Sequence, residues 1–66
     1  MAEQTTVQSV ERTFGIIELL CKKGESGVTE LAVLSGLNKT TVFRLLSTLI
    51  GLGYAYKNPA TEKYGL

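Results

Sequence analysis

The chain has 66 residues, of which 44% are hydrophobic and 20% charged, and its formal net charge is +1 at neutral pH. This length allows one small domain with one modest core, and the apolar content argues against a disordered chain. The single cysteine, Cys21, excludes an internal disulfide, and no Cys/His cluster is present to hold zinc. The N-terminal sequence lacks the basic start and apolar run of a signal peptide, and no apolar run is long enough to span a membrane. We therefore expect a reduced, cytoplasmic protein without a cofactor.

The first predicted element is a helix over about residues 8–22. Residues 1–6 before it are polar, and we expect them to form a disordered tail. Ser9 is a reasonable N-cap for this helix. Lys22 and Lys23 suit its last turn, and Gly24 suits the left-handed residue that ends it.

One narrow apolar stripe follows this helix at about 100° per residue, and we predict that it is the buried face. The stripe consists of Val10, Phe14, Ile17 and Cys21, with Leu20 at its edge. Ile16 and Leu19 fall on the other side, where they suit either a partner helix or simple exposure to solvent. We favour the partner, because a domain this small gains from dimerising.

Two more helices and a hairpin complete the predicted chain. After a possible extended piece at Gly27-Val28, a second helix covers about 29–35 with Thr29 as its cap. A third helix runs from its cap Asn38 to about 51, where Gly51 and Gly53 end it. The segments "YAYK", "NPATE" and "KYGL" then predict strand, turn and strand over 54–66, with the three tyrosines in the core.

The spacing across the second and third helices fits a helix-turn-helix. Such a joint needs a small residue at the helix contact, a glycine in the turn, and apolar residues on the buried side of the second helix. Those positions are filled, in register, by Ala32, Gly36, Val42 and Leu45. The alternative is a chance helical hairpin in a small bundle.

The third helix has two unlike faces. One arc is apolar and consists of Val42, Leu45, Leu46, Leu49 and Ile50. The opposite arc has hydroxyls, one arginine and no acid: Thr40, Thr41, Arg44, Ser47 and Thr48, with Phe43 at its edge. Thr and Ser are poor helix formers, but they suit phosphates and base edges. Phe43 either packs under the hairpin or meets base methyl groups.

The charge distribution adds a mild indication of an anionic partner. Residues 1–37 contain three basic and five acidic residues, whereas residues 38–66 contain four basic and one acidic residue. The chain has no histidine and no aspartate, and no Ser or Cys has a visible base, so we expect no catalytic activity.

Four ordered segments resemble the IclR family of bacterial transcription regulators. They are "SVERTFGIIELL", "TELAVLSGLNKTTVFRLLSTL", "GLGY" and "KYGL", which cover nearly the whole chain from Val7 onward. The resemblance implies a winged helix-turn-helix at 7–66, mainly α with a small β wing, in which 38–51 is the recognition helix and 54–66 the wing. In the family, a larger effector-binding domain follows the wing, and the resemblance implies that this domain is absent from the present chain. Any small-molecule effector is therefore expected to bind that absent domain.

The resemblance further implies which residues contact DNA. Lys39, Thr40, Thr41 and Arg44 match the recognition stretch, and Arg12 matches an arginine of the first helix on the phosphate side. Considered without the resemblance, the charge of Arg12 suits either contact with a phosphate or an ion pair with Glu11. Two residues depart from the family pattern, since Asn38 stands where proline is frequent and Gly15 weakens the first helix by about 1 kcal/mol relative to alanine.

We therefore expect sequence-specific binding of double-stranded DNA by a homodimer that reads a near-palindromic operator. The full set of expected DNA contacts is Arg12, Lys39, Thr40, Thr41, Phe43, Arg44, Ser47, Thr48, Lys57 and Lys63. Lys57 and Lys63 flank the wing turn and suit either phosphate contact or protection of a strand edge. The competing hypothesis is a winged helix used for protein–protein contact, which predicts an apolar or acidic face on the third helix. RNA binding would instead call for aromatic residues on an exposed sheet.

Overall fold

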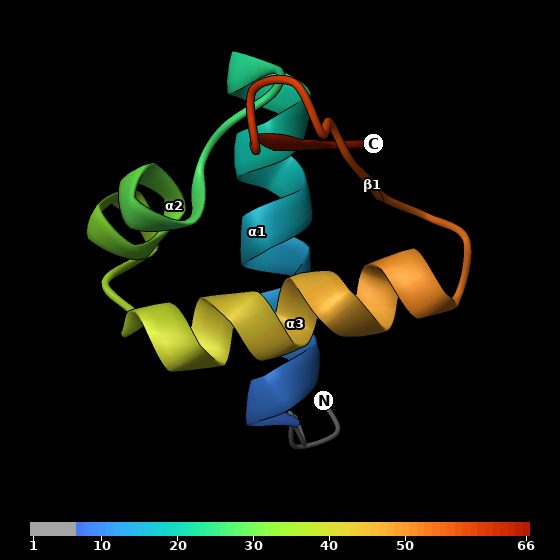
Figure 1. Ribbon diagram of the computed structural model, residues 1–66. Coiled ribbons are helices and arrows are strands. Elements are labelled where there is room, and N and C mark those ends of the chain that lie inside the picture. Colours follow the sequence, from blue (N-terminus) through green and yellow to red (C-terminus); the bar gives the residue numbers. More distant parts are fainter. Residues whose placement is uncertain (1–6) are drawn as a thin grey trace.

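The computed structural model describes residues 7–66, and the predicted tail at 1–6 lies outside that range. Helices α1 (Gln8–Lys23), α2 (Val28–Ser35) and α3 (Lys39–Gly51) come first in the chain. Strands β1 (Tyr56–Lys57) and β2 (Tyr64–Gly65) follow, and they pair antiparallel with Tyr56 opposite Gly65. The predicted fold of three helices and a C-terminal two-stranded hairpin is confirmed (Figure 1). Within residues 7–66, no helix has the length and apolarity to cross a membrane.

Helix α1 forms the centre of the domain (Figure 1). Helix α3 crosses over it, α2 lies to one side, and the hairpin lies beside the C-terminal end of α1. The core contains one contiguous cluster of buried side chains from all four parts: Ile16, Leu20, Leu31, Ala32, Val42, Leu46 and Tyr64. The partly buried Leu19, Val28, Leu37 and Leu45 pack against it. Burial of this cluster is the main source of stability in so small a domain.

The prediction of which face of α1 is buried was wrong. Val10 is 51% exposed, Phe14 is 58% exposed, and Cys21 is exposed as well. Ile16 is instead fully buried, and Leu19 packs against the core, so these two residues do not form the exposed partner patch that the sequence predicted. Leu20, which the sequence placed at the edge of the predicted stripe, is buried as expected. The other members are left outside the core cluster, because α2, α3 and the hairpin all contribute to the core on the side of Ile16 and Leu20.

The helix ends agree with the sequence at some positions only. The Asn38 cap is confirmed, because its Oδ1 accepts a hydrogen bond from the Thr41 amide at 2.8 Å. Gly36 ends α2 in the left-handed conformation, with φ 75° and ψ 11°. The predicted caps Ser9 and Thr29 are wrong. The residues that precede α1 and α2 are Val7 and Gly27, and neither helix start has a side-chain cap.

The loop between α1 and α2 is hydrogen-bonded to both strands of the hairpin. Ser26 pairs with Tyr64 through two backbone hydrogen bonds of 2.9 and 2.8 Å, so the extended contact lies at Ser26 and not at the predicted Gly27-Val28. Glu25 accepts a hydrogen bond of 2.6 Å from the Tyr56 hydroxyl, and this bond raises the pKa of Tyr56 above its ordinary value. A Cβ at Gly65 would lie 2.6 Å from the same hydroxyl oxygen, so any other residue there would require the Tyr56 ring to shift.

The tyrosines were predicted to be core residues, and this holds for one of the three. Tyr64 is 4% exposed, whereas Tyr54 is 68% and Tyr56 is 45% exposed. The difference follows from the short hairpin. Tyr64 is bridged to the α1–α2 loop and belongs to the core cluster. Tyr54 lies in the connection after α3 and does not belong to that cluster.

Candidate nucleic-acid interface

The polar face of α3 points to solvent because its opposite face is held in the core. Val42 and Leu46 are fully buried, and Leu49 is 4% exposed. Ile50, predicted to belong to the same apolar arc, is 37% exposed near the end of the helix. On the outer side, the predicted contact residues are exposed except for the half-buried Thr41: Lys39, Thr40, Phe43, Arg44, Ser47 and Thr48.

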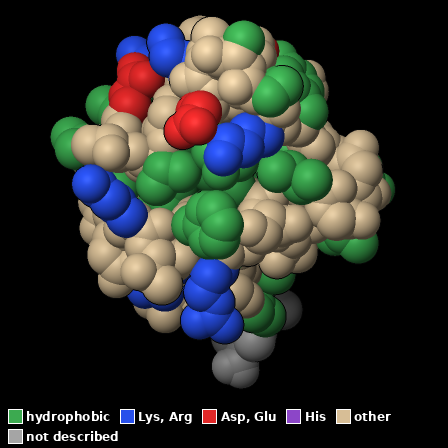
Figure 2. Space-filling view, in the orientation of Figure 1, with side chains coloured by type: hydrophobic (Ala, Val, Ile, Leu, Met, Phe, Trp, Pro, Cys, Tyr) green, Lys and Arg blue, Asp and Glu red, His purple; other side chains and the backbone are tan. Residues whose placement is uncertain are grey.

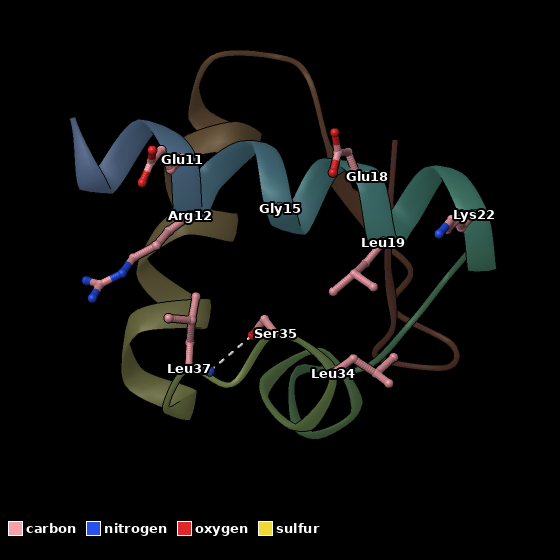
Figure 3. A pocket seen from close by; sticks show the side chains of 9 residues that line it. All are labelled: Glu11, Arg12, Gly15, Glu18, Leu19, Lys22, Leu34, Ser35 and Leu37. Carbon is pink, nitrogen blue, oxygen red and sulfur yellow. Dashed lines mark hydrogen bonds between the residues drawn. The ribbon is translucent and has the colours of Figure 1, made fainter. Parts of the chain in front are cut away.

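The joint between α2 and α3 fixes the direction of that face. Ala32 is buried at the helix contact, and Leu45 is half-buried and packs against the core. The Ser35 hydroxyl donates to the Ala32 carbonyl at 3.4 Å. It also accepts from the Leu37 amide at 3.2 Å (Figure 3). A turn closed by these bonds and by the left-handed Gly36 leaves α3 little freedom to rotate relative to α2.

A hollow of about 300 Å³ lies where the N-terminal half of α1 meets α3. Arg12 enters it from α1 and Arg44 from α3, and its other lining residues are Ser9, Thr41, Leu45 and Thr48. In Figure 3, Arg12 leaves α1 away from the side on which Glu11 and Glu18 project. No carboxylate lines the hollow. We call this site the arginine hollow.

Among residues 7–66, no acid forms an ion pair with either arginine of the hollow. The one ion pair among residues 7–66 joins Lys23 to Glu30 at 3.6 Å, so the alternative in which Arg12 pairs with Glu11 is not realised. Two guanidinium groups beside hydroxyls, with no carboxylate between them, favour an anion with several oxygen acceptors. The arginine hollow therefore has the chemistry of a phosphate site.

Hydrogen bonds to the backbone determine which other hydroxyl and amide groups of α3 are available to a ligand. The Thr48 hydroxyl donates to the Arg44 carbonyl at 3.0 Å, so its remaining capacity is as an acceptor. The Thr41 amide is used by the Asn38 cap. Lys39 and Thr40 are the first two residues of α3, so their amides have no hydrogen-bond acceptor within the helix. These N–H groups point outward from the N-terminal end of α3, where they can bind an anion.

The hairpin lysines lie apart from the arginine hollow and on different faces. Lys57 is directly opposite Tyr64 in the hairpin, and its Nζ lies 5.7 Å from the centre of that ring. Lys63, the residue before Tyr64, faces the other way by strand alternation. It borders a shallow depression beside α2 together with Lys23 and Glu30.

Four of the ten predicted contact residues thus meet in one place: Arg12, Thr41, Arg44 and Thr48. Ser9 joins them, although the sequence indicated a cap there. Its spacing of three residues from Arg12 puts both on one side of a helix, which is a signal the sequence contained. The other predicted residues on α3 share its exposed face, and Phe43 stands out from it at 52% exposure.

Comparisons with known proteins show the family and the fold of this chain. The family model of the IclR helix-turn-helix domain matches residues 9–59. The HTH-type transcriptional regulator KdgR of Dickeya chrysanthemi is 41% identical over 61 residues, which is 92% of this chain and 20% of that protein. The HTH-type transcriptional regulator XynR of Escherichia coli K12 is also 41% identical over 61 residues, or 91% of this chain and 24% of that protein. The chain thus spans about a fifth to a quarter of the length of these relatives.

Solved structures give the same fold. The crystal structure of an IclR transcriptional regulator from Alicyclobacillus acidocaldarius aligns with a TM-score of 0.89 at 34% identity, over 94% of this chain and 26% of that one. The Zalpha domain of Carassius auratus PKZ, solved in complex with Z-DNA, aligns with a TM-score of 0.84 over 91% of this chain and 98% of that one. At 24% identity, this second likeness concerns the fold alone.

Proposed function

Because the chain belongs to the IclR helix-turn-helix domain family, we propose that it binds double-stranded DNA sequence-specifically with α3 in the major groove. The observation that carries this proposal is the arginine hollow beside the exposed polar face of α3. A major groove about 12 Å wide admits one α-helix, and it presents a distinct pattern of hydrogen-bonding groups for each base pair.

The residues of α3 divide into two roles. Arg44 reads a base edge, since a guanidinium can donate two hydrogen bonds to O6 and N7 of guanine. Ser47 and Thr48 offer hydroxyls, and the exposed ring of Phe43 offers apolar contact to a thymine methyl. Lys39, Thr40 and Thr41 hold a phosphate at the start of the helix, with the free amides of the first turn.

Arg12 and the hairpin hold the DNA backbone on either side. In this proposal Arg12 contacts a phosphate that enters the arginine hollow from the side of α1. Lys57 and Lys63 contact the backbone from the wing. Because these two lysines face opposite ways, one of them contributes directly and the other adds only long-range attraction.

We further propose that two copies bind a near-palindromic operator as a bacterial, cytoplasmic regulator. With a net charge of +1, one copy neutralises few phosphates, so a single copy should bind weakly and depend on the second for useful affinity. The relatives KdgR and XynR are named as transcriptional regulators and are four to five times longer. Recognition of any small-molecule effector is therefore assigned to the remainder of such a protein.

Selection from a pool of random duplexes tests the proposal, with binding then measured across a series of salt concentrations. The wild-type chain should enrich a preferred sequence. Arg44→Ala should lose the preference at one position and bind more weakly by about 1–3 kcal/mol. Arg12→Ala should bind all sequences more weakly, and the slope of log affinity against log salt should fall by about 1.

Lys22→Ala is the matched control, because it removes one positive charge from an exposed position of α1 that does not line the arginine hollow. It should keep the preferred sequence and most of the affinity. If no sequence is enriched and Arg44→Ala behaves like Lys22→Ala, α3 does not read bases. The use of this domain for protein contact would then be the better hypothesis.

A further inference from the structure

One carboxylate in the loop between α1 and α2 holds the hairpin at two side chains. Glu25 is half-buried in that loop, and it accepts a hydrogen bond of 2.6 Å from the Tyr56 hydroxyl. Nδ2 of Asn58 donates to the same carboxylate, at 3.3 and 3.4 Å from its two oxygens. These partners are 31 and 33 residues away from Glu25 in the chain, so the contact depends on the tertiary structure. We call Glu25, Tyr56 and Asn58 the wing clamp.

The Tyr56 side chain of the wing clamp is held at its ring and at its hydroxyl. The ring lies against Gly65, since a Cβ at Gly65 would be 2.6, 2.7 and 2.9 Å from three atoms at the hydroxyl end of Tyr56. A hydrogen bond to a carboxylate is stronger than one between neutral groups. The bond to Glu25 also raises the pKa of Tyr56, so the phenol keeps its proton and remains a donor at neutral pH.

The Asn58 side chain of the wing clamp organises the turn of the hairpin. The Asn58 amide donates to the Lys63 carbonyl at 2.8 Å, and the Asn58 carbonyl accepts from the Glu62 amide at 2.7 Å. Its Oδ1 accepts from the Ala60 amide at 2.9 Å, and Nδ2 is the remaining group, which donates to Glu25. All four polar groups of Asn58 are thus hydrogen-bonded. Loss of the carboxylate would leave Nδ2 without this acceptor.

Lys57 lies between the two residues that the wing clamp holds, so the direction of the backbone at Lys57 depends on the clamp. Its side chain points to the opposite face of the strand from Tyr56 by strand alternation. Lys57 is exposed, and it forms no ion pair within residues 7–66. Lys63, by contrast, borders a depression that also contains Glu30. Of the two wing lysines, Lys57 is therefore the better placed to contact a phosphate.

We propose that Glu25 is a positioning residue for DNA binding, which acts through Tyr56 and Asn58 to hold Lys57 against the DNA backbone. This inference rests on the proposed function, and it names the wing lysine that contacts a phosphate and the group that directs it. The proposal gives a carboxylate a favourable effect on the binding of a polyanion. A carboxylate that acted only through its charge would repel DNA, so the sign of the effect separates the two cases.

Binding to the preferred duplex at several salt concentrations tests this sign. Glu25→Ala should weaken binding by about five-fold and lower the slope of log affinity against log salt by about 1, because one phosphate contact is lost. Glu18→Ala is the matched control, since it removes a carboxylate from an exposed position of α1 outside the wing clamp. It should bind as tightly as the wild-type chain or more tightly. The same result for Glu25→Ala would overturn the proposal.

A double-mutant cycle tests whether Glu25 acts through Lys57. Lys57→Ala alone should weaken binding by about the same factor as Glu25→Ala, because each removes the same phosphate contact. The chain with both substitutions should bind no more weakly than either single variant, since residues that act as one unit are not additive. If the two factors multiply instead, Glu25 does not act through Lys57, and the proposal is wrong.

Amide hydrogen exchange tests the wing clamp without DNA. In Glu25→Ala, the amides of Asn58 and Glu62 in the hairpin turn should exchange about ten-fold faster than in the wild-type chain, because the turn opens more often. The amide of Leu46 in α3 should not change. Tyr56→Phe removes one hydrogen bond and no charge, and should give a smaller increase at the same two amides.

The exchange results separate the clamp from overall stability and from DNA recognition. Unchanged exchange at Asn58 and Glu62 in Glu25→Ala would overturn the proposal. An equal increase at Leu46 would also overturn it, because Glu25 would then stabilise the whole domain. A wild-type chain that binds no duplex would instead contradict the proposed function, and the exchange rates would still show whether Glu25 holds the hairpin.

Discussion

Helices α1 and α3 both contain apolar stripes, but the structure buries them differently. In α3 a single apolar arc faces a polar one, so only one orientation buries apolar surface, and Val42 and Leu46 are fully buried. In α1 two apolar stripes compete, one containing Ile16 and Leu20 and the other containing Val10 and Phe14. The domain core takes the first stripe and leaves the second exposed. An amphipathic pattern thus determines the orientation of a helix only where it contains one apolar stripe.

The largest expected effect comes from truncating one apolar residue in each helix. Leu46→Ala should lower the free energy of unfolding by about 2–5 kcal/mol, because it empties a fully buried site on α3. Phe14→Ala should cost less than about 1 kcal/mol, because the ring is 58% exposed. Urea unfolding followed by circular dichroism at low micromolar concentration measures both. Equal losses would mean that the Phe14 stripe is buried within a single copy, against the contrast drawn here.

The starts of the two helices give a smaller contrast. Asn38→Ala should destabilise the domain by about 1 kcal/mol, because the Thr41 amide loses the acceptor that caps α3. Ser9→Ala should change stability by only a few tenths of a kcal/mol, because Ser9 lies inside α1 and caps nothing. Thermal melting of both variants beside the wild type compares them directly. A loss at Ser9 as large as that at Asn38 would show that α1 begins at the cap which the sequence suggested.

The smallest effect concerns the glycine within α1. Gly15→Ala should stabilise the domain by about 0.5–1 kcal/mol and raise the melting temperature by several degrees, because no atom lies within 4 Å of the added Cβ. Gly36→Ala is the comparison, since its φ of 75° strains any residue with a Cβ and should lower the melting temperature. If Gly15→Ala were also destabilising, α1 would contact something at that position even in a single copy.

Much of the candidate interface was predictable because it depends on local spacing. The α2–α3 joint, the Asn38 cap and the polar face of α3 each involve residues within about ten positions of one another. The hollow that joins Arg12 to Arg44 was not predictable from the spacing, because it depends on the angle at which α3 crosses α1. Figure 2 shows basic side chains at several separate places on the side viewed.

The amino-acid sequence by itself determined the order of the elements, the helix-turn-helix joint and the composition of the α3 surface, because these follow from the periodicity and backbone preferences of nearby residues. The tertiary structure alone decided which stripe of α1 is buried, which tyrosine joins the core, and which way each wing lysine faces the rest of the molecule. These features depend on competition between surfaces that are far apart in the chain. Ile16 is buried and Phe14 is exposed because residues of α2, α3 and the hairpin pack on the Ile16 side of α1.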